Sequence, residues 1–192
     1  MRIHTRKLAL ASILMALNMV IAPLWFPFLA TKAFPGQHLI NSIAGVYLGP
    51  IWAAVIAAIV GVMRNALGIG TIYAFPGGIP GGIIVGLMYN FLRKFLDEKK
   101  ALISALFEPV GTLFVGAPLA LFMVSPLAPL FGQESMSLAP GGYLITLLYL
   151  WVGWGASCIP GSVIAFMVLV TLEKSGLNRR IMFGEKNEVE GR

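Results

Sequence analysis

Five polar side chains interrupt the long apolar stretches of this sequence: His38, Asn41, Arg64, Asn65 and Glu108. Lipid offers such groups no hydrogen-bond partner, so an unsatisfied one is costly at membrane depth. Each must therefore bond to a neighbouring helix or bind a solute. An imidazole, two amides, a guanidinium and a carboxylate together suit hydrogen bonding to a small polar molecule.

These side chains fall into two clusters that we expect to face one cavity. Gln37, His38 and Asn41 lie near the outer end of one predicted helix, and Arg64 with Asn65 lies near the outer end of the next. Arg64 has the alternative of extending to the outer lipid headgroups. Asn41 has the alternative of a hydrogen bond between helices.

Glu108 and two tryptophans complete the set of candidate binding residues. Glu108 lies inside a later apolar run and is followed by Pro109, which leaves three roles open: binding a ligand, pairing with Arg64, or accepting a proton. Trp151 and Trp154 lie deeper in the last apolar run than the interfacial belt where tryptophan is usual. One or both are expected to stack on a flat heterocycle, with ordinary packing as the alternative.

The composition is that of an integral membrane protein. Of the 192 residues, 58% are apolar and only 11% are charged, whereas a soluble domain carries about a quarter charged residues. This balance excludes ordinary soluble, disordered and nucleic-acid-binding proteins. A single cysteine, Cys158, excludes an intramolecular disulfide and any site built from several cysteines.

We predict an all-α fold, a bundle of six transmembrane helices in residues 1–172 followed by a polar, loosely ordered cytoplasmic tail in residues 173–192. The predicted spans are Leu8–Phe28, His38–Gly49, Pro50–Arg64, Gly77–Leu96, Ala101–Phe131 and Tyr143–Leu172. The second rises only about 18 Å, less than the ~30 Å hydrocarbon core, and such short helices occur inside bundles or along cavities.

The distribution of basic residues favours six spans with both termini in the cytoplasm. In that topology only Lys32 and Arg64 lie outside, and the other 12 of the 14 lysines and arginines lie inside. One continuous helix over residues 38–64 gives five spans and places the N-terminal basic cluster on the wrong side. A break at Gly49-Pro50 is therefore predicted.

Small residues recur at four-residue spacing on several predicted helices. Gly78, Gly82 and Gly86 form one such stripe, which favours close helix packing. The connections 31–38 and 68–78 each contain a Phe-Pro-Gly step. These connections either close over a bound solute or form simple ordered turns.

The sequence carries no recognised catalytic or cofactor motif. A zincin HExxH, a Gly-x-Ser-x-Gly elbow, a Walker A loop and a dinucleotide fingerprint are all missing. We therefore expect no enzyme activity, no cofactor and no metal. ATP-driven transport would need partner subunits.

Four segments are similar to the corresponding stretches of ThiW-type proteins: Phe34–Pro50, Arg64–Thr71, Ala74–Gly77 and Glu108–Thr112. This resemblance covers about residues 1–172. It implies a substrate-binding S component of an energy-coupling factor (ECF) vitamin importer in the plasma membrane of a prokaryote. Such a component binds a vitamin precursor at the outer face and docks on a transmembrane coupling subunit driven by two cytoplasmic ATPases.

The resemblance also implies a substrate and a docking surface. The family's proposed substrate is hydroxyethylthiazole, the thiazole precursor of thiamine, while hydroxymethylpyrimidine and thiamine remain alternatives. Docking in this superfamily uses an Ala-x-x-x-Ala pattern on the first helix, and Ser12 and Ala16 stand at the matching positions. Two other functions stay open: a proton-coupled secondary transporter that uses Glu108, and a non-transporting membrane scaffold.

Overall fold

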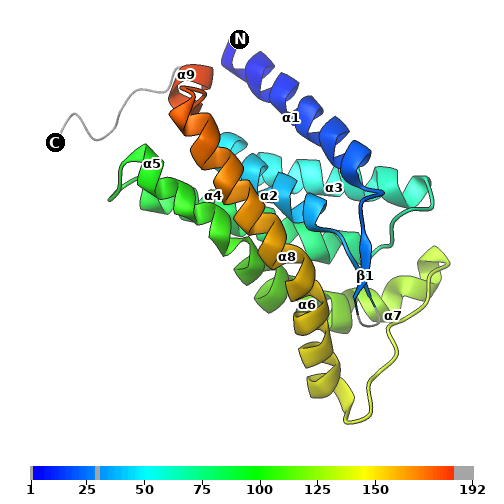
Figure 1. The fold of residues 1–192 in the computed structure, drawn as a ribbon. Helices are drawn as coiled ribbons and strands as arrows, with labels where there is room; N and C mark the ends of the chain where they lie inside the picture. The colour runs from blue at the N-terminus through cyan, green and yellow to red at the C-terminus, as the bar shows by residue number, and fades with distance from the viewer. Residues whose placement is uncertain (1, 29–30, 184–192) are drawn as a thin grey trace.

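The computed structural model describes residues 2–28 and 31–183 as a helical bundle with one short hairpin (Figure 1). The longer helices are α1 (Arg2–Ile21), α2 (Pro35–Leu48), α3 (Pro50–Ala66), α4 (Ala74–Leu92) and α8 (Gly142–Lys174). The hairpin consists of β1 (Phe26–Phe28) and β2 (Thr31–Ala33). Between α4 and α8 lie α5 (Glu98–Ala101), η1 (Leu102–Phe107), η2 (Val110–Gly116), α6 (Ala117–Leu119), η3 (Ala120–Val124), α7 (Ser125–Leu127) and η4 (Ala128–Phe131), and α9 (Arg179–Phe183) follows α8.

The first helix is shorter than the sequence predicts. A continuous helix to Phe28 was expected, but α1 ends at Ile21 and Phe26 pairs with Ala33 in an antiparallel hairpin. Pro23 and Pro27 explain the difference, because proline has no backbone N–H to donate within a helix. The predicted first span is therefore wrong at its C-terminal end.

The predicted break between the second and third helices is confirmed. α2 ends at Leu48 and α3 begins at Pro50. Gly49 has φ +90°, a conformation that side chains disfavour, and Pro50 takes the first helical turn where its missing N–H is not needed. The chain therefore reverses with no connecting loop.

Both Phe-Pro-Gly steps begin helices rather than lying in loops. α2 begins at Pro35, and the second step, Phe75-Pro-Gly, forms the first turn of α4. Proline is tolerated in a first helical turn because its N–H would have no partner there. The connection between α3 and α4 is therefore shorter than predicted.

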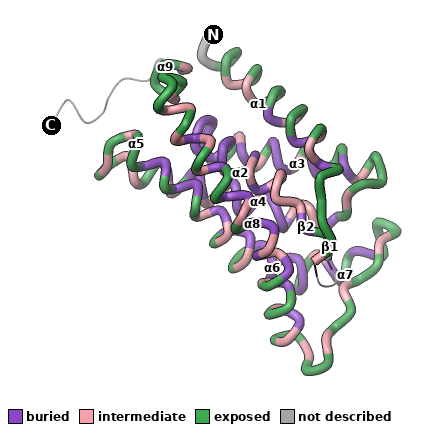
Figure 2. The backbone as a smooth tube through the Cα atoms, viewed as in Figure 1, coloured by how far each residue is buried: buried purple, intermediate pink, exposed green. Residues whose placement is uncertain are grey.

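α2 lies at the centre of the bundle. It contacts α1, α3, α4, α8 and η1, and every residue from Ile40 to Leu48 is buried. Figure 2 shows buried backbone concentrated here and along α4, while α1 is exposed over much of its length. A 14-residue helix can occupy this position because its surroundings are protein on all sides.

Glycines allow the helices around α2 to approach closely. A Cβ on Gly45 would lie 2.7 Å from Val85 Cγ1, and one on Gly82 would lie 3.0 Å from the Ala53 Cβ. A Cβ on Gly86 would meet the backbone nitrogen of Pro50 at 2.4 Å. The interpretation of the small-residue stripes as packing surfaces is confirmed.

The segment Glu98–Phe131 is one helical path with irregular winding. Pro109, Pro118 and Pro126 interrupt its hydrogen bonding, and two stretches, η2 and η3, are wound as π-helix. Proline removes a donor and clashes with the preceding turn, which commonly produces such local winding. Glu108 lies where the winding changes from η1 to η2.

The beginning of the predicted tail is folded. In α9, Arg179 donates a 3.1 Å hydrogen bond to the Val46 carbonyl, and Phe183 is buried beneath the Lys7 ammonium. Tyr47 Oη donates to the Leu177 carbonyl at 2.6 Å. The prediction of a loosely ordered tail is therefore wrong up to Phe183, and residues 184–192 lie outside the described residues.

Three helical segments in the described part of the chain are long and apolar enough to cross a membrane: α4, Glu98–Phe131 and α8. α3 is apolar but shorter. The N-terminal end of α1 and α9 lie together at one end of the bundle (Figure 1). The hairpin and the connection before α8 lie toward the other end.

Candidate functional site

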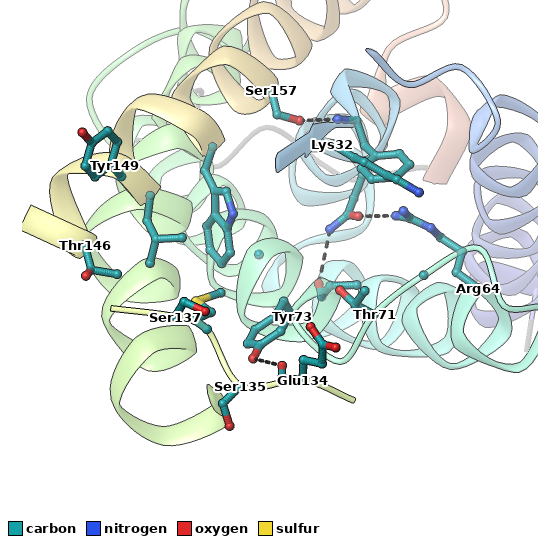
Figure 3. Close-up of a pocket in the computed structure, with 18 of the residues that line it drawn as sticks. Lys32, Arg64, Thr71, Tyr73, Glu134, Ser135, Ser137, Thr146, Tyr149 and Ser157 are labelled. Atoms are coloured by element: carbon teal, nitrogen blue, oxygen red, sulfur yellow. Dashed lines mark hydrogen bonds between the residues drawn. The ribbon is translucent and has the colours of Figure 1, made fainter. Parts of the chain in front are cut away.

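A cavity of about 1060 Å³ lies at the end of the bundle away from α9. Its walls come from the start of α2, the end of α3, the connection 68–74, the connection before α8, and the first half of α8. Figure 3 shows Arg64 and Lys32 on one side, Tyr149 and Thr146 on the other, and Tyr73 with Glu134 between them. Its volume lies at the upper end of the range for clefts that hold small molecules.

Arg64 forms one wall together with the first turn of α2. Its guanidinium donates from Nη1 to Gln37 Oε1 at 2.5 Å and lies 4.2 Å from the centre of the Phe34 ring. Gln37 Nε2 in turn donates to the Ala74 carbonyl, which ties this wall to the start of α4. Arg64 is only 2% exposed, so it does not extend to the headgroups.

His38 lines the cavity and is held from behind by Glu108. The two are joined by a 2.7 Å contact between His38 Nδ1 and Glu108 Oε1, and Thr112 Oγ1 donates to the same carboxylate oxygen at 2.9 Å. Both side chains are buried, and Glu108 Oε2 has no hydrogen-bond partner among the described residues. Glu108 contacts His38, a pairing that we did not foresee from the sequence, and the expected alternative of a pair with Arg64 is wrong.

Glycines in α4 make room for this polar group. A Cβ on Gly81 would lie 2.2 Å from Glu108 Oε1, and a Cβ on Gly78 would lie 2.5 Å from Gln37 Nε2. Asn41 Nδ2 donates to the Gly78 carbonyl at 3.0 Å. The glycine face of α4 is thus both a packing surface and the space in which the polar residues of α2 and Glu108 fit.

The two tryptophans have different environments in the structure. Trp154 lines the cavity and its ring lies against Gly77, 3.7 Å from the position of a Cβ there. Trp151 instead donates from Nε1 to the Leu113 carbonyl at 2.8 Å and packs on Phe114. Trp151 therefore anchors α8 to η2 and does not line the cavity.

Asn65 and Asn41 support the cavity without lining it. Asn65 Nδ2 donates to the Gly61 and Thr71 carbonyls, and its Oδ1 accepts from Gln133 Nε2 at 2.9 Å. This bonding joins the end of α3 to the connection before α8. Gln37, His38, Arg64 and Trp154 are the predicted site residues that line the cavity, whereas Asn41, Asn65, Glu108 and Trp151 lie behind it.

Sequence reasoning missed the connection between η4 and α8. Residues 134–140 line the cavity, with Tyr73 Oη donating to the Glu134 carbonyl and the Ile72 amide donating to Gln133 Oε1. Ser157, whose hydroxyl accepts from the Phe34 amide at 2.7 Å, was missed as well. The available signal was the polar run Gln133–Ser137, which separates two apolar segments.

Ser12 and Ala16 lie on the outside of the bundle. Both are exposed on α1, while Ala11 and Leu14 of the same helix face the core. The Ser12 hydroxyl donates to the Leu8 carbonyl of its own helix at 3.1 Å. These two positions are available for contact with another protein.

The chain matches the family described as thiamine-precursor transporter protein (ThiW) over residues 8–175. It belongs to the ThiW family. No curated protein and no solved structure matches the chain significantly. The family resemblance found in the sequence is confirmed, and the matched region contains the whole cavity.

ThiW membership gives the protein a transport function in a membrane, with a small molecule as substrate. The three apolar helices long enough to cross a bilayer agree with this. The family therefore indicates a transport function for the chain. In the described part of this ThiW chain, no group of three or more His, Cys, Asp or Glu residues is placed to hold a metal ion.

Proposed function

We propose that this ThiW protein is the substrate-binding S subunit of an ECF-type importer and captures hydroxyethylthiazole at the outer face of the plasma membrane of a prokaryote. The carrying observation is a cavity that combines an indole face with hydrogen-bonding groups, Trp154 with His38 and Gln37. A flat heterocycle with a hydroxyl group needs such a combination. ATP hydrolysis belongs to the partner subunits.

The position of the cavity supports capture from outside. In a six-span topology with cytoplasmic termini, α1 and α9 place their basic residues, including Arg6 and Arg180, inside. The cavity lies at the opposite end of the bundle, beside Lys32 and Arg64. It therefore opens to the outer face in this orientation.

The exposed face of α1 supports docking to a transmembrane coupling subunit. Ser12 and Ala16 are small and lie one turn apart, which permits close helix approach. Leu8, Ile13 and Val20 are exposed on the same helix. We assign this face to the coupling subunit, which two cytoplasmic ATPase subunits drive.

A self-sufficient proton-coupled transporter is the second candidate. The fully buried Glu108, with one oxygen unpartnered, is the observation that favours it, because buried carboxylates in transporters serve as proton sites. Uptake into proteoliposomes that contain this protein alone distinguishes the two. Proton-gradient-driven uptake without ATPase subunits would establish the second candidate and exclude the first.

Equilibrium binding to the purified protein in detergent tests the proposal. We expect saturable binding of hydroxyethylthiazole, with hydroxymethylpyrimidine and thiamine titrated in parallel. His38→Ala should weaken binding at least about tenfold, the worth of one lost hydrogen bond in a desolvated site. Asn90→Ala, at an exposed position of α4, is the control variant and should bind normally. If none of the three compounds binds, the thiamine-precursor assignment fails for this chain.

The two tryptophans give a second test of the binding geometry. Trp154→Ala should weaken hydroxyethylthiazole binding about tenfold or more, because it removes the indole ring on which we expect the thiazole to stack. Trp151→Ala is the matched control, and should change affinity less than about threefold because its ring contacts Phe114 instead. Isothermal titration calorimetry measures both. A larger loss in Trp151→Ala than in Trp154→Ala would refute the proposed position of the ring.

A further inference from the structure

Arg64 is a buried cation that faces the cavity with few partners of its own. Its side chain is 2% exposed and lines the cavity. Its contacts are one hydrogen bond to Gln37 Oε1 and the face of the Phe34 ring. Its Nε is buried and has no hydrogen-bond partner in the described structure.

None of the described acidic residues neutralises this charge. Within the described ranges, the ion pairs join Glu108 to His38 and Asp97 to Lys100. Glu98 accepts from Tyr89 Oη, and Glu173 accepts from Asn178, both away from the cavity. Glu134 lines the cavity but is exposed on its connection, and forms no ion pair with Arg64.

A guanidinium removed from water is stable only when its charge is compensated. An amide oxygen and an aromatic face compensate it partly, each less effectively than a carboxylate. Among the described residues none forms an ion pair with Arg64, and Glu134, which lines the same cavity, is exposed. We therefore expect the compensating group to come from a ligand in the cavity that Arg64 lines. Lys32, exposed on the same side of the cavity, adds a second positive charge (Figure 3).

The other polar side chains on this wall, Gln37 and His38, already bond to protein groups. Glu108 holds the Nδ1 side of His38, so the other ring nitrogen is directed away from that carboxylate. Gln37 uses its oxygen for Arg64 and its amide nitrogen for the Ala74 carbonyl. The amide oxygen of Gln37 is therefore already used by Arg64.

We propose that Arg64 binds an anionic group on the ligand, so that a thiazole carrying a carboxylate or phosphate binds more tightly than the neutral alcohol hydroxyethylthiazole. This inference rests on the proposed function, because it takes the thiazole ring from it. The anion forms charge-assisted hydrogen bonds with Arg64, and the ring lies toward Trp154. Gln37 and Phe34 hold the guanidinium in position in the absence of ligand.

The test compares three ligands on the purified full-length protein: hydroxyethylthiazole, its phosphate ester, and the thiazole acetate in which a carboxylate replaces the terminal CH2OH. We expect at least one of the two anions to bind at least about tenfold tighter than the alcohol, as expected for a charge-assisted bond in a desolvated site. Equal or tighter binding of the alcohol overturns the inference while leaving the proposed function intact. Failure of all three to bind defeats both.

Substitutions at position 64 identify the group responsible. In Arg64→Gln the anion and the alcohol should bind about equally well. In Arg64→Lys, which keeps the charge, the anion should still bind several-fold tighter than the alcohol. Lys94→Gln removes one positive charge at an exposed position outside the cavity and should keep the full preference. Each variant is first checked for monodisperse elution in detergent. A preference for the anion that survives in Arg64→Gln overturns the assignment to this residue.

Discussion

Glu108→Ala should lower the free energy of unfolding by about 3 kcal/mol, because it removes a carboxylate to which two buried groups hydrogen-bond. The substitution leaves His38 without the carboxylate that lies 2.7 Å from its Nδ1. It also leaves the Thr112 hydroxyl without one of its two acceptors. Both groups are buried where water cannot replace the lost bonds.

Two variants separate the charge from the shape of this side chain. Glu108→Gln keeps an oxygen acceptor of the same size and should lose less stability than Glu108→Ala. Glu134→Ala removes an exposed carboxylate and should change stability by no more than about 0.5 kcal/mol. If Glu108→Ala and Glu134→Ala both unfold at the wild-type temperature, the contact between Glu108 and His38 does not stabilise the fold.

The chain offers a convenient reporter for this measurement. Cys158 is buried and is the single cysteine in the sequence. A thiol-reactive fluorophore therefore reacts only as the bundle opens, and its fluorescence on heating records unfolding in detergent. None of the variants compared here adds or removes a thiol.

Gly86→Ala should be the most damaging of the glycine substitutions between α3 and α4, with a loss of about 3 kcal/mol at the upper end of overpacking costs. The added Cβ would lie 2.4 Å from the Pro50 nitrogen and 2.7 Å from its Cα. These are backbone atoms at the turn between α2 and α3, so they cannot move aside as a flexible side chain can. The variant must displace one helix from the other.

Gly155→Ala is the matched control within the same fold. The nearest atom to its added Cβ is Ile159 Cδ1 at 3.7 Å, an ordinary contact. Alanine is also the better helix former, so this variant should be as stable as the wild type or more stable. Equal unfolding temperatures for the two alanine variants would show that the approach of α4 to Pro50 is not as close as described.

Local signals in the sequence were sufficient for much of the fold. Gly49-Pro50 predicted a break because glycine tolerates positive φ, and proline fixes φ and lacks the N–H that a helix interior requires. The glycine stripe of α4 predicted close contacts because residues four apart share a helix face. By contrast, the end of α1 was misplaced because the run to Phe28 is apolar throughout, and hydrophobicity alone hid the effect of Pro23.

The candidate site was harder to predict, because it depends on how helices rotate about their axes. Trp151 and Trp154 are three residues apart, so they share much the same depth, yet one packs on η2 and the other lines the cavity. The partner of Glu108 likewise depended on which helix lay opposite. From the sequence we considered Arg64 as a partner and missed His38, which the packing of α2 against η1 brings within reach of Glu108.

The central position of α2 has a consequence for how the protein responds to its membrane. No described residue of α2 is exposed, so the length of this short helix does not have to match the thickness of the hydrocarbon core. A thicker or thinner bilayer acts instead on the longer peripheral segments, which can tilt to accommodate hydrophobic mismatch. Gln37 and His38 belong to α2, so a change in bilayer thickness does not act directly on the helix that carries them. Ligand affinity should therefore vary little between lipids of different chain length.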